Sequence, residues 1–124
     1  MLDSNKIIGF IPITDAARAK SFYADTLELK FVSDDQFALV FDANGNMLRL
    51  VRMKEFTPQR FTILGWEVPD IETAVRQLSA NGVKFERYEF VQQDDLGIWT
   101  APGGAKVAWF LDPDGNNLSV SQHT

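Results

Sequence analysis

The sequence contains no cysteine and a single histidine, His123, and both shortages narrow the chemistry open to the chain. Without cysteine there are no disulfides, thiolate nucleophiles, iron–sulfur clusters or cysteine zinc sites. With one histidine, no site that needs two imidazole ligands can form. Metal binding would therefore rest on carboxylates, which suit hard ions better than zinc or copper.

Basic residues are outnumbered, at 12 Lys and Arg against 17 Asp and Glu, which gives a net charge of −5. Nucleic-acid binding depends on basic side chains that neutralise phosphates, so we expect no nucleic-acid partner. No apolar run approaches the roughly 20 residues that a membrane helix needs, so we expect no membrane partner. The short apolar stretch after residues 1–6 contains Pro12 and indicates a strand rather than a signal peptide, which favours a cytoplasmic protein.

The length of 124 residues fits one compact domain spanning 1–124, and 45% hydrophobic content with 12% aromatic residues is typical of a folded globule. A chain of this size buries about two-thirds of its unfolded surface, so no disulfide or metal is needed for stability.

The first half, about residues 6–53, predicts the order β-α-β-β-β. Asp15 is a good N-cap, and Ala16, Ala19, Phe22 and Tyr23 follow at helical spacing, with the helix fading near Asp25. Strands are expected over 6–14, 29–33, 37–41 and 46–53.

The second half, about residues 61–122, predicts the same order. Asp70 caps a helix that ends at Asn81-Gly82, where glycine is the natural left-handed residue after a helix. Strands are expected over 61–68, 83–90, 105–111 and 117–122.

The two halves also match in amino-acid sequence. The capping residues Asp15 and Asp70 lie 55 positions apart, whereas DANGNMLR at 42–49 matches DPDGNNLS at 112–119 at a spacing of 70. The difference of 15 residues indicates an insertion within 86–104. Two matched units of this kind indicate an internal repeat.

Three segments resemble the vicinal-oxygen-chelate superfamily, which contains glyoxalase I, bleomycin-resistance proteins and extradiol dioxygenases. They are FIPITDAARAKSFYADTLEL at 10–29, GWEVPDIETAVRQLSANGVKF at 65–85 and DPDGNNLSV at 112–120. The resemblance implies an α+β fold in which two βαβββ repeats form a curved mixed sheet around a cavity. One fold hosts many chemistries, so the resemblance places the fold better than the function.

Metal-dependent members of that superfamily hold a divalent ion with His, Gln or Glu side chains from the first and last strand of each unit. Carried over by motif, those four positions are Ile8, Arg49, Ile63 and Ser119. Two of these side chains have no donor atom, one is cationic, and a lone serine hydroxyl is a poor ligand for a divalent ion. The resemblance thus implies the fold and a cavity, while the sequence predicts no metal and no cofactor.

Strand alternation predicts which side chains line the cavity, because every second residue shares a face. The predicted ligand-binding residues are Ile8, Phe10, Met47, Arg49, Val51, Ile63, Gly65, Glu67, Asn117, Ser119 and Ser121. A mostly apolar concavity with a few polar groups is typical of a small-molecule site. Gly65 either leaves room for a ligand or relieves crowding between strands.

Arg49 and Glu67 are the candidate catalytic residues. Arg49 either is solvated or paired with Glu67 at the rim, or binds a carboxylate or enolate of a ligand. Glu67 is either that partner or a general base, with Arg49 stabilising the developing oxyanion.

Other side chains leave two interpretations open. The aromatic residues Tyr88, Phe90, Trp99 and Trp109 either form a stacking wall or belong to the core. The acidic cluster of the inserted segment is either an acidic lid or a solvated loop, and it comprises Glu86, Glu89, Asp94 and Asp95.

The favoured hypothesis is a metal-free protein that binds a small molecule and resembles bleomycin-resistance proteins, without enzymatic activity. The alternatives are a lyase or isomerase that uses Glu67 and Arg49 in place of the metal, and a protein-interaction module. The net charge favours a cationic ligand, whereas Arg49 favours an anionic one. Because related proteins complete the cavity with a second chain, the resemblance also implies a homodimer.

Overall fold

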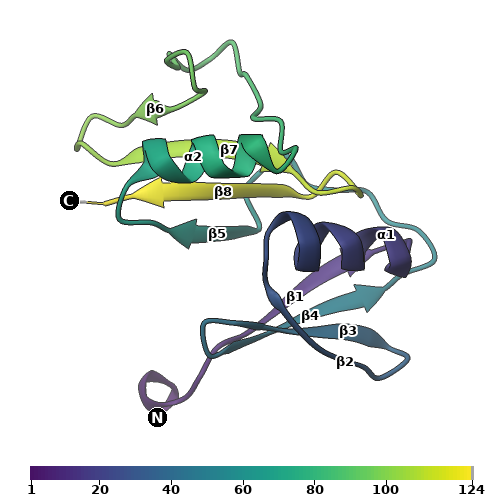
Figure 1. Ribbon diagram of the computed structural model, residues 1–124. Helices are drawn as coiled ribbons and strands as arrows, with labels where there is room; N and C mark the ends of the chain where they lie inside the picture. Colours follow the sequence, from purple (N-terminus) through teal and green to yellow (C-terminus); the bar gives the residue numbers. More distant parts are fainter. Residues whose placement is uncertain (124) are drawn as a thin grey trace. The chain divides into compact units, whose positions relative to one another are not determined.

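The computed structural model describes residues 1–123 and divides the chain into two compact units, Met1–Thr57 and Pro58–Thr124. Each unit contains one four-stranded mixed sheet and one main helix, as Figure 1 shows. The predicted α+β class and the repeated β-α-β-β-β order are confirmed. No helix within residues 1–123 is both long enough and apolar enough to cross a membrane.

The first unit has the strand order β1-β4-β3-β2, with β1 parallel to β4 and the other pairs antiparallel. A short 3-10 helix, η1 (Leu2–Ser4), precedes the sheet. The remaining elements are β1 (Ile8–Ile13), α1 (Ala16–Lys20), η2 (Ser21–Thr26), β2 (Lys30–Asp34), β3 (Ala38–Ala43) and β4 (Asn46–Arg52).

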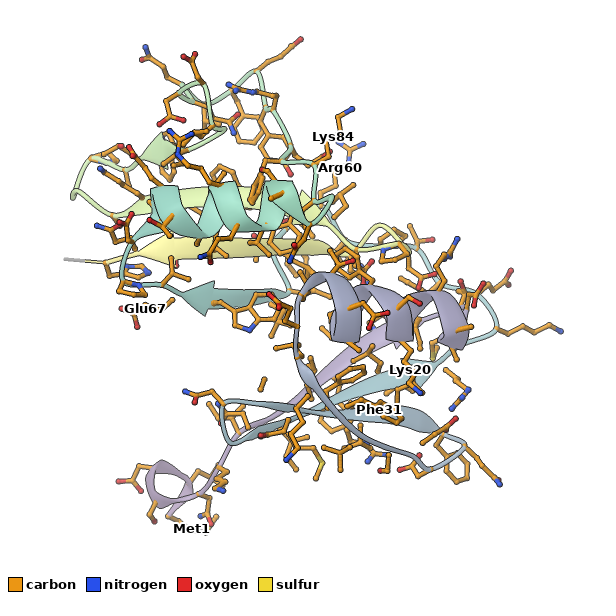
Figure 2. All side chains as sticks on the ribbon, viewed as in Figure 1. Met1, Lys20, Phe31, Arg60, Glu67 and Lys84 are labelled. Carbon is orange, nitrogen blue, oxygen red and sulfur yellow. The ribbon has the colours of Figure 1, made fainter. Side chains whose placement is uncertain are left out.

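The predicted first helix begins as an α-helix at the expected residue and continues as a π-helix. The Asp15 side chain accepts a hydrogen bond from the Arg18 backbone nitrogen at 3.1 Å, which is the capping role that the sequence predicts. After Lys20 the helix continues as a π-helix, η2, which carries the fully buried Tyr23. The Lys20 ammonium lies 4.0 Å from the centre of the Phe31 ring, and both are labelled in Figure 2.

The two faces of the first sheet differ sharply in exposure. Ile11 of β1 and its parallel partner Leu50 of β4 are 1% and 0% exposed. On the opposite face, Phe10 is 62% exposed and Ile8 47% exposed, beside Arg49 and Met47 respectively. This division follows the alternation that the sequence predicts.

The second unit repeats the topology in the order β5-β8-β7-β6, with β5 parallel to β8. Its elements are β5 (Leu64–Glu67), α2 (Ile71–Ala80), β6 (Trp99–Thr100), β7 (Lys106–Leu111) and β8 (Asn117–Gln122). Helix α2 packs on β7 and β8, and its buried residues Ile71 and Val75 meet a sheet face that carries Phe110 and Leu118.

Both ends of α2 fall where the sequence predicts them. The Asp70 side chain accepts a hydrogen bond from the Thr73 backbone nitrogen at 3.3 Å. After the helix, Gly82 has a φ of +99°, a left-handed conformation that glycine adopts without steric cost.

The strand predicted over 83–90 is wrong. This segment contacts the sheet through one isolated bridge, Phe85 to Phe110, and through the Glu86 nitrogen, which donates to the Trp109 carbonyl at 2.8 Å. The fourth strand of the sheet is instead the two-residue β6, Trp99–Thr100. The backbone of 83–90 is satisfied partly by a side chain, that of Gln93, and therefore needs no neighbouring strand.

The first strand of the second unit is also shorter than predicted, because it begins at Leu64 rather than at Phe61. Ladder-like bonding starts with the Ile63 nitrogen, which donates to the Asn117 carbonyl at 2.9 Å. Further upstream, the Arg60 carbonyl accepts from the Asn117 side chain rather than from a strand backbone.

Candidate functional site: an aromatic cavity in the second unit

The second unit contains a cavity of about 640 Å³ beside the ends of β7 and β8. Three parts of the chain line it: residues 58–62, the irregular segment 86–90, and residues of β7, β8 and the turn between them, namely Trp109, Leu111, Gly115 and Asn117. Four aromatic side chains contribute to the lining, namely Phe61, Tyr88, Phe90 and Trp109. A concave, largely apolar surface of this size is typical of a site for a small organic molecule.

The aromatic side chains of the cavity are packed against one another. The Tyr88 and Phe90 rings are stacked with their centres 5.3 Å apart, and Tyr88 meets Trp109 edge to face at 5.5 Å. Behind the cavity, Trp109 is stacked on Trp99 at 6.0 Å. These contacts hold the rings in place. Phe90 is nevertheless 82% exposed, so most of its surface is open to solvent.

A buried amide organises the floor of the cavity. Asn117 is 5% exposed, and its Nδ2 donates to the Arg60 carbonyl at 3.2 Å and to the Tyr88 hydroxyl at 3.0 Å. Its Oδ1 accepts from the Thr62 hydroxyl at 3.2 Å. One side chain thus joins the segment 60–62, the start of β8 and the aromatic wall.

The Gln93 side chain holds the aromatic wall in place. Its Oε1 accepts from the Tyr88 backbone nitrogen at 2.8 Å. Its Nε2 donates to the Glu86 carbonyl at 2.9 Å and to the Gly97 carbonyl at 2.7 Å. These three bonds replace the ladder that a regular strand would supply.

The first unit has a smaller hollow, of about 350 Å³, at the equivalent place in its repeat. Its lining includes Ile7, Gly45 and Met47, which correspond by the repeat spacings to Thr62, Gly115 and Asn117 of the larger cavity. Where the second unit has a hydrogen-bonding asparagine, the first has methionine. The hollow of the first unit therefore lacks the polar floor.

Arg49 and Arg52 of β4 are paired with acidic residues at the end of β2 and in the turn that follows it. Arg49 Nη2 donates to Asp35 Oδ2 at 2.6 Å, and Arg52 pairs with Asp34. The hydrogen bond from Arg49 is the main cause that holds the pKa of the Asp35 carboxyl below its usual range. This acidic partner lies in the same unit as Arg49 and was missed by the sequence analysis. The signal that could have found it is the pair Asp34-Asp35 between the strands predicted over 29–33 and 37–41.

The other predicted polar residues lie on one face of the second sheet. Gly65 pairs with Ser119, and Glu67 with Ser121, across β5 and β8. Glu67 is exposed at the end of β5 (Figure 2). Ser121 Oγ lies 3.0 Å from His123 Nε2. Because Arg49 and Glu67 belong to separate units, their convergence on one substrate stays a prediction.

Crowding between strands accounts for Gly65. A Cβ at this position would lie 2.7 Å from Ser119 Oγ, which is closer than side-chain atoms normally approach. This close approach fits relief of crowding, whereas room for a ligand at Gly65 stays a prediction.

Of the predicted ligand-binding residues, Asn117 lines the larger cavity, while Ile8 and Met47 line the smaller hollow. Tyr88, Phe90 and Trp109 line the larger cavity as the stacking-wall interpretation requires, whereas Trp99 supports them from behind. Of the acidic cluster, Glu86 reaches the cavity lining.

The four positions implied by the resemblance do not fit a divalent metal. Ile8 and Ile63 carry no donor atom, Arg49 is cationic and bound to Asp35, and Ser119 offers one hydroxyl. Within residues 1–123, no group of three or more His, Asp or Glu side chains is placed to hold a metal ion.

A model of the Glyoxalase/Bleomycin resistance protein/Dioxygenase superfamily matches residues 7–120, most of the chain. The chain belongs to this superfamily. The internal repeat and the strand order β1-β4-β3-β2, found again as β5-β8-β7-β6, are therefore the glyoxalase/bleomycin-resistance fold. The comparison with curated proteins found no match.

Solved structures with the same fold include three relatives of low sequence identity. A glyoxalase family protein from Bacillus anthracis has a TM-score of 0.76 at 14% identity, covering 98% of this chain and 96% of that one. A superfamily member from Sphaerobacter thermophilus has a TM-score of 0.76 at 22% identity, covering 99% and 100%. Lactoylglutathione lyase from Agrobacterium tumefaciens has a TM-score of 0.74 at 18% identity, covering 96% and 93%. At these identities the likeness establishes the fold alone.

Proposed function

We propose that this glyoxalase-superfamily protein binds a small organic molecule without a metal, and that the aromatic cavity of the second unit holds it. The observation that carries the proposal is the cavity of about 640 Å³ with its walls of Phe61, Tyr88, Phe90 and Trp109. Binding sites for small molecules typically measure roughly 300–1,000 Å³ and combine apolar walls with a few polar groups. Asn117 and Tyr88 supply such polar groups here.

The absence of donor atoms at the metal positions of the superfamily supports a metal-independent mode of binding. Ile8 and Ile63 cannot ligate an ion, and Arg49 is paired with Asp35. We expect the protein as purified to hold less than about one-tenth of an equivalent of Zn, Ni, Mn or Fe by elemental analysis. A stoichiometric metal whose chelation lowers the melting temperature would overturn this part of the proposal.

A thermal-shift screen preceded by native mass spectrometry tests for the ligand. A compound present at 100 times its Kd should add about 2.7 kcal/mol to the free energy of unfolding, and so raise the melting temperature by several degrees. The screen should contain small acids, thiol conjugates and aromatic compounds. If no compound raises the melting temperature and none co-purifies, the proposal fails.

Two exposed phenylalanines give a matched test of where the ligand binds. Phe90, 82% exposed, lines the cavity, and Phe37, 78% exposed, belongs to the first unit. We expect Phe90→Ala to weaken binding about fivefold, because an aromatic contact contributes about 1 kcal/mol. Phe37→Ala should leave binding unchanged. An equal effect of the two variants would place the ligand elsewhere.

We also propose that the protein forms a homodimer in the cytoplasm. The exposed apolar face of the first sheet, with Phe10 and Ile8 at 62% and 47% exposure, supports self-association. Light scattering should give about twice the 14.0 kDa mass of the chain. A monomer at micromolar concentration would contradict the proposal. Catalysis by Glu67 and Arg49 stays an alternative proposal.

A further inference from the structure

The hydrogen bonds of Asn117 fix the orientation of its amide group. Nδ2 faces the Arg60 carbonyl at 3.2 Å, and a carbonyl oxygen can only accept. The amide nitrogen must therefore point toward Arg60, and the oxygen must point toward the Thr62 hydroxyl, 3.2 Å away. A flipped amide would bring two acceptors together at the Arg60 carbonyl.

This orientation determines how the Tyr88 hydroxyl is used. The same Nδ2 lies 3.0 Å from Tyr88 Oη, so the hydroxyl accepts from Asn117 and its own hydrogen points elsewhere. Within residues 1–123, no acceptor receives this hydrogen. Tyr88 lines the cavity, so the hydrogen is available to a molecule inside it.

The remaining lining favours a flat molecule without net charge. Phe61, Phe90 and Trp109 present aromatic surfaces, on which planar rings stack. The lining contains one cation, Arg60, and one anion, Glu86, so the formal charges of this pair cancel. A planar ring system with a neutral acceptor such as a carbonyl satisfies both the walls and the free hydroxyl hydrogen.

We propose that the cavity selects planar aromatic molecules bearing a carbonyl group, that the Tyr88 hydroxyl is the specificity-determining donor to that carbonyl, and that Asn117 is its positioning residue. This inference rests on the proposed function, since it names the ligand class for the same cavity. Asn117 acts by occupying the acceptor side of the hydroxyl, which leaves the hydrogen for the ligand.

A pair of matched probes tests the inference directly. Fluorenone and fluorene are both flat three-ring molecules, and they differ in one carbonyl group. Binding is measured by NMR titration of the full chain, following the indole N–H signal of Trp109, which lines the cavity. We expect fluorenone to bind about five- to tenfold more tightly, the value of one hydrogen bond of about 1–1.4 kcal/mol.

Tyr88→Phe removes the hydroxyl and keeps the ring that stacks on Phe90 at 5.3 Å. The preference for fluorenone should fall to within about twofold, while fluorene binding stays unchanged. The matched control is Phe90→Leu, which should weaken both probes equally and keep the preference. Asn117→Asp introduces a carboxylate that can accept the Tyr88 hydrogen, so it should also remove the preference without changing fluorene binding.

The outcomes separate this inference from the proposed function. Equal binding of the two probes, or an unchanged preference in Tyr88→Phe, overturns the role of Tyr88. The inference also fails if neither probe binds while other library compounds shift the Trp109 signal, although the proposed function then stands. If no compound shifts that signal, both fail. Should Asn117→Asp not fold, the result for Tyr88→Phe decides.

Discussion

Arg52 and Asp34 form a bidentate ion pair, in which Nη1 donates to Oδ1 and Nη2 donates to Oδ2, each at 2.7 Å. This bidentate pair joins the end of β4 to the end of β2 and lies at the surface. The hydrogen bonds from Arg52, together with one from the Gln36 backbone nitrogen, lower the pKa of Asp34 from its ordinary 3.8 to about 2.

The Asp34 pair predicts a specific loss of stability in acid. Because the folded-state pKa is lowered, the pair stabilises the fold above about pH 4, and this contribution is lost as the pH falls through 2. In Arg52→Gln, carboxyl NMR should show the Asp34 midpoint moving back toward 3.8. Wild type should resist urea better than Arg52→Gln at pH 6, and the difference should shrink to a small remainder at pH 2, where Asp34 of the folded protein is about half protonated. A stability difference as large at pH 2 as at pH 6 would contradict this origin.

The matched turns of the two repeats predict unequal costs for the same substitution. Asp112, 5% exposed, accepts from the Asp114 and Asn116 backbone nitrogens at 2.9 Å each and from Asn116 Nδ2 at 2.8 Å. Its counterpart Asp42 accepts from the Gly45 nitrogen at 2.8 Å. We expect Asp112→Ala to cost about 3 kcal/mol and Asp42→Ala about 1 kcal/mol in urea unfolding. If the two substitutions lower the free energy of unfolding equally, the buried hydrogen bonds of Asp112 add nothing to stability.

The close approach of Gly65 to Ser119 predicts strong coupling between the two positions. Gly65→Ala would place a Cβ 2.7 Å from Ser119 Oγ, and we expect a loss of about 1–2 kcal/mol in the free energy of unfolding. Adding Ser119→Ala removes that oxygen and leaves the Ser119 Cβ at an ordinary 4.0 Å. The double variant should recover at least half of the loss. Strictly additive effects would refute the contact as the cause.

Loss of Gln93 should loosen the aromatic wall without unfolding the sheet. Gln93→Ala removes the bonds to Glu86, Tyr88 and Gly97, and we expect it to cost about 2 kcal/mol. Hydrogen exchange of the Tyr88 amide should accelerate, while that of the buried strand residue Phe110 should change little. The exposed neighbour Gln92 offers the control, since Gln92→Ala should leave both rates unchanged. If the exchange rate of the Tyr88 amide is unchanged in Gln93→Ala, the Gln93 side chain does not hold the aromatic wall in place.

Local chemistry made most of the fold predictable from the sequence. Asp15 and Asp70 cap their helices as expected, and the D-x-x-G-N turns fall between the predicted strands. The strand expected over 83–90 failed for a physical reason. Its aromatic and β-branched residues are typical of strands, but part of its backbone is bound by the Gln93 side chain, and a strand pattern carries no sign of such a side-chain partner.

The candidate site was predictable only in part. Strand alternation correctly assigned Asn117 and Ser119 to one face of the second sheet, because register follows from the repeat. It missed Asp35 as the partner of Arg49, since that contact depends on how the β2–β3 turn folds back along the sheet. It also left the role of Tyr88 open, because this residue lies on the segment whose conformation was predicted wrongly.

The wall that carries Glu86, Tyr88 and Phe90 is held by a single bridge and by side-chain hydrogen bonds of Gln93 and Asn117 rather than by a full ladder. Most substitutions along this wall therefore leave the register of β7 and β8 intact. Relatives with the same strand order can diversify here at little risk to folding, as antibody frameworks do with their loops. Ligand preference can thus evolve along one short stretch of chain while the scaffold stays constant.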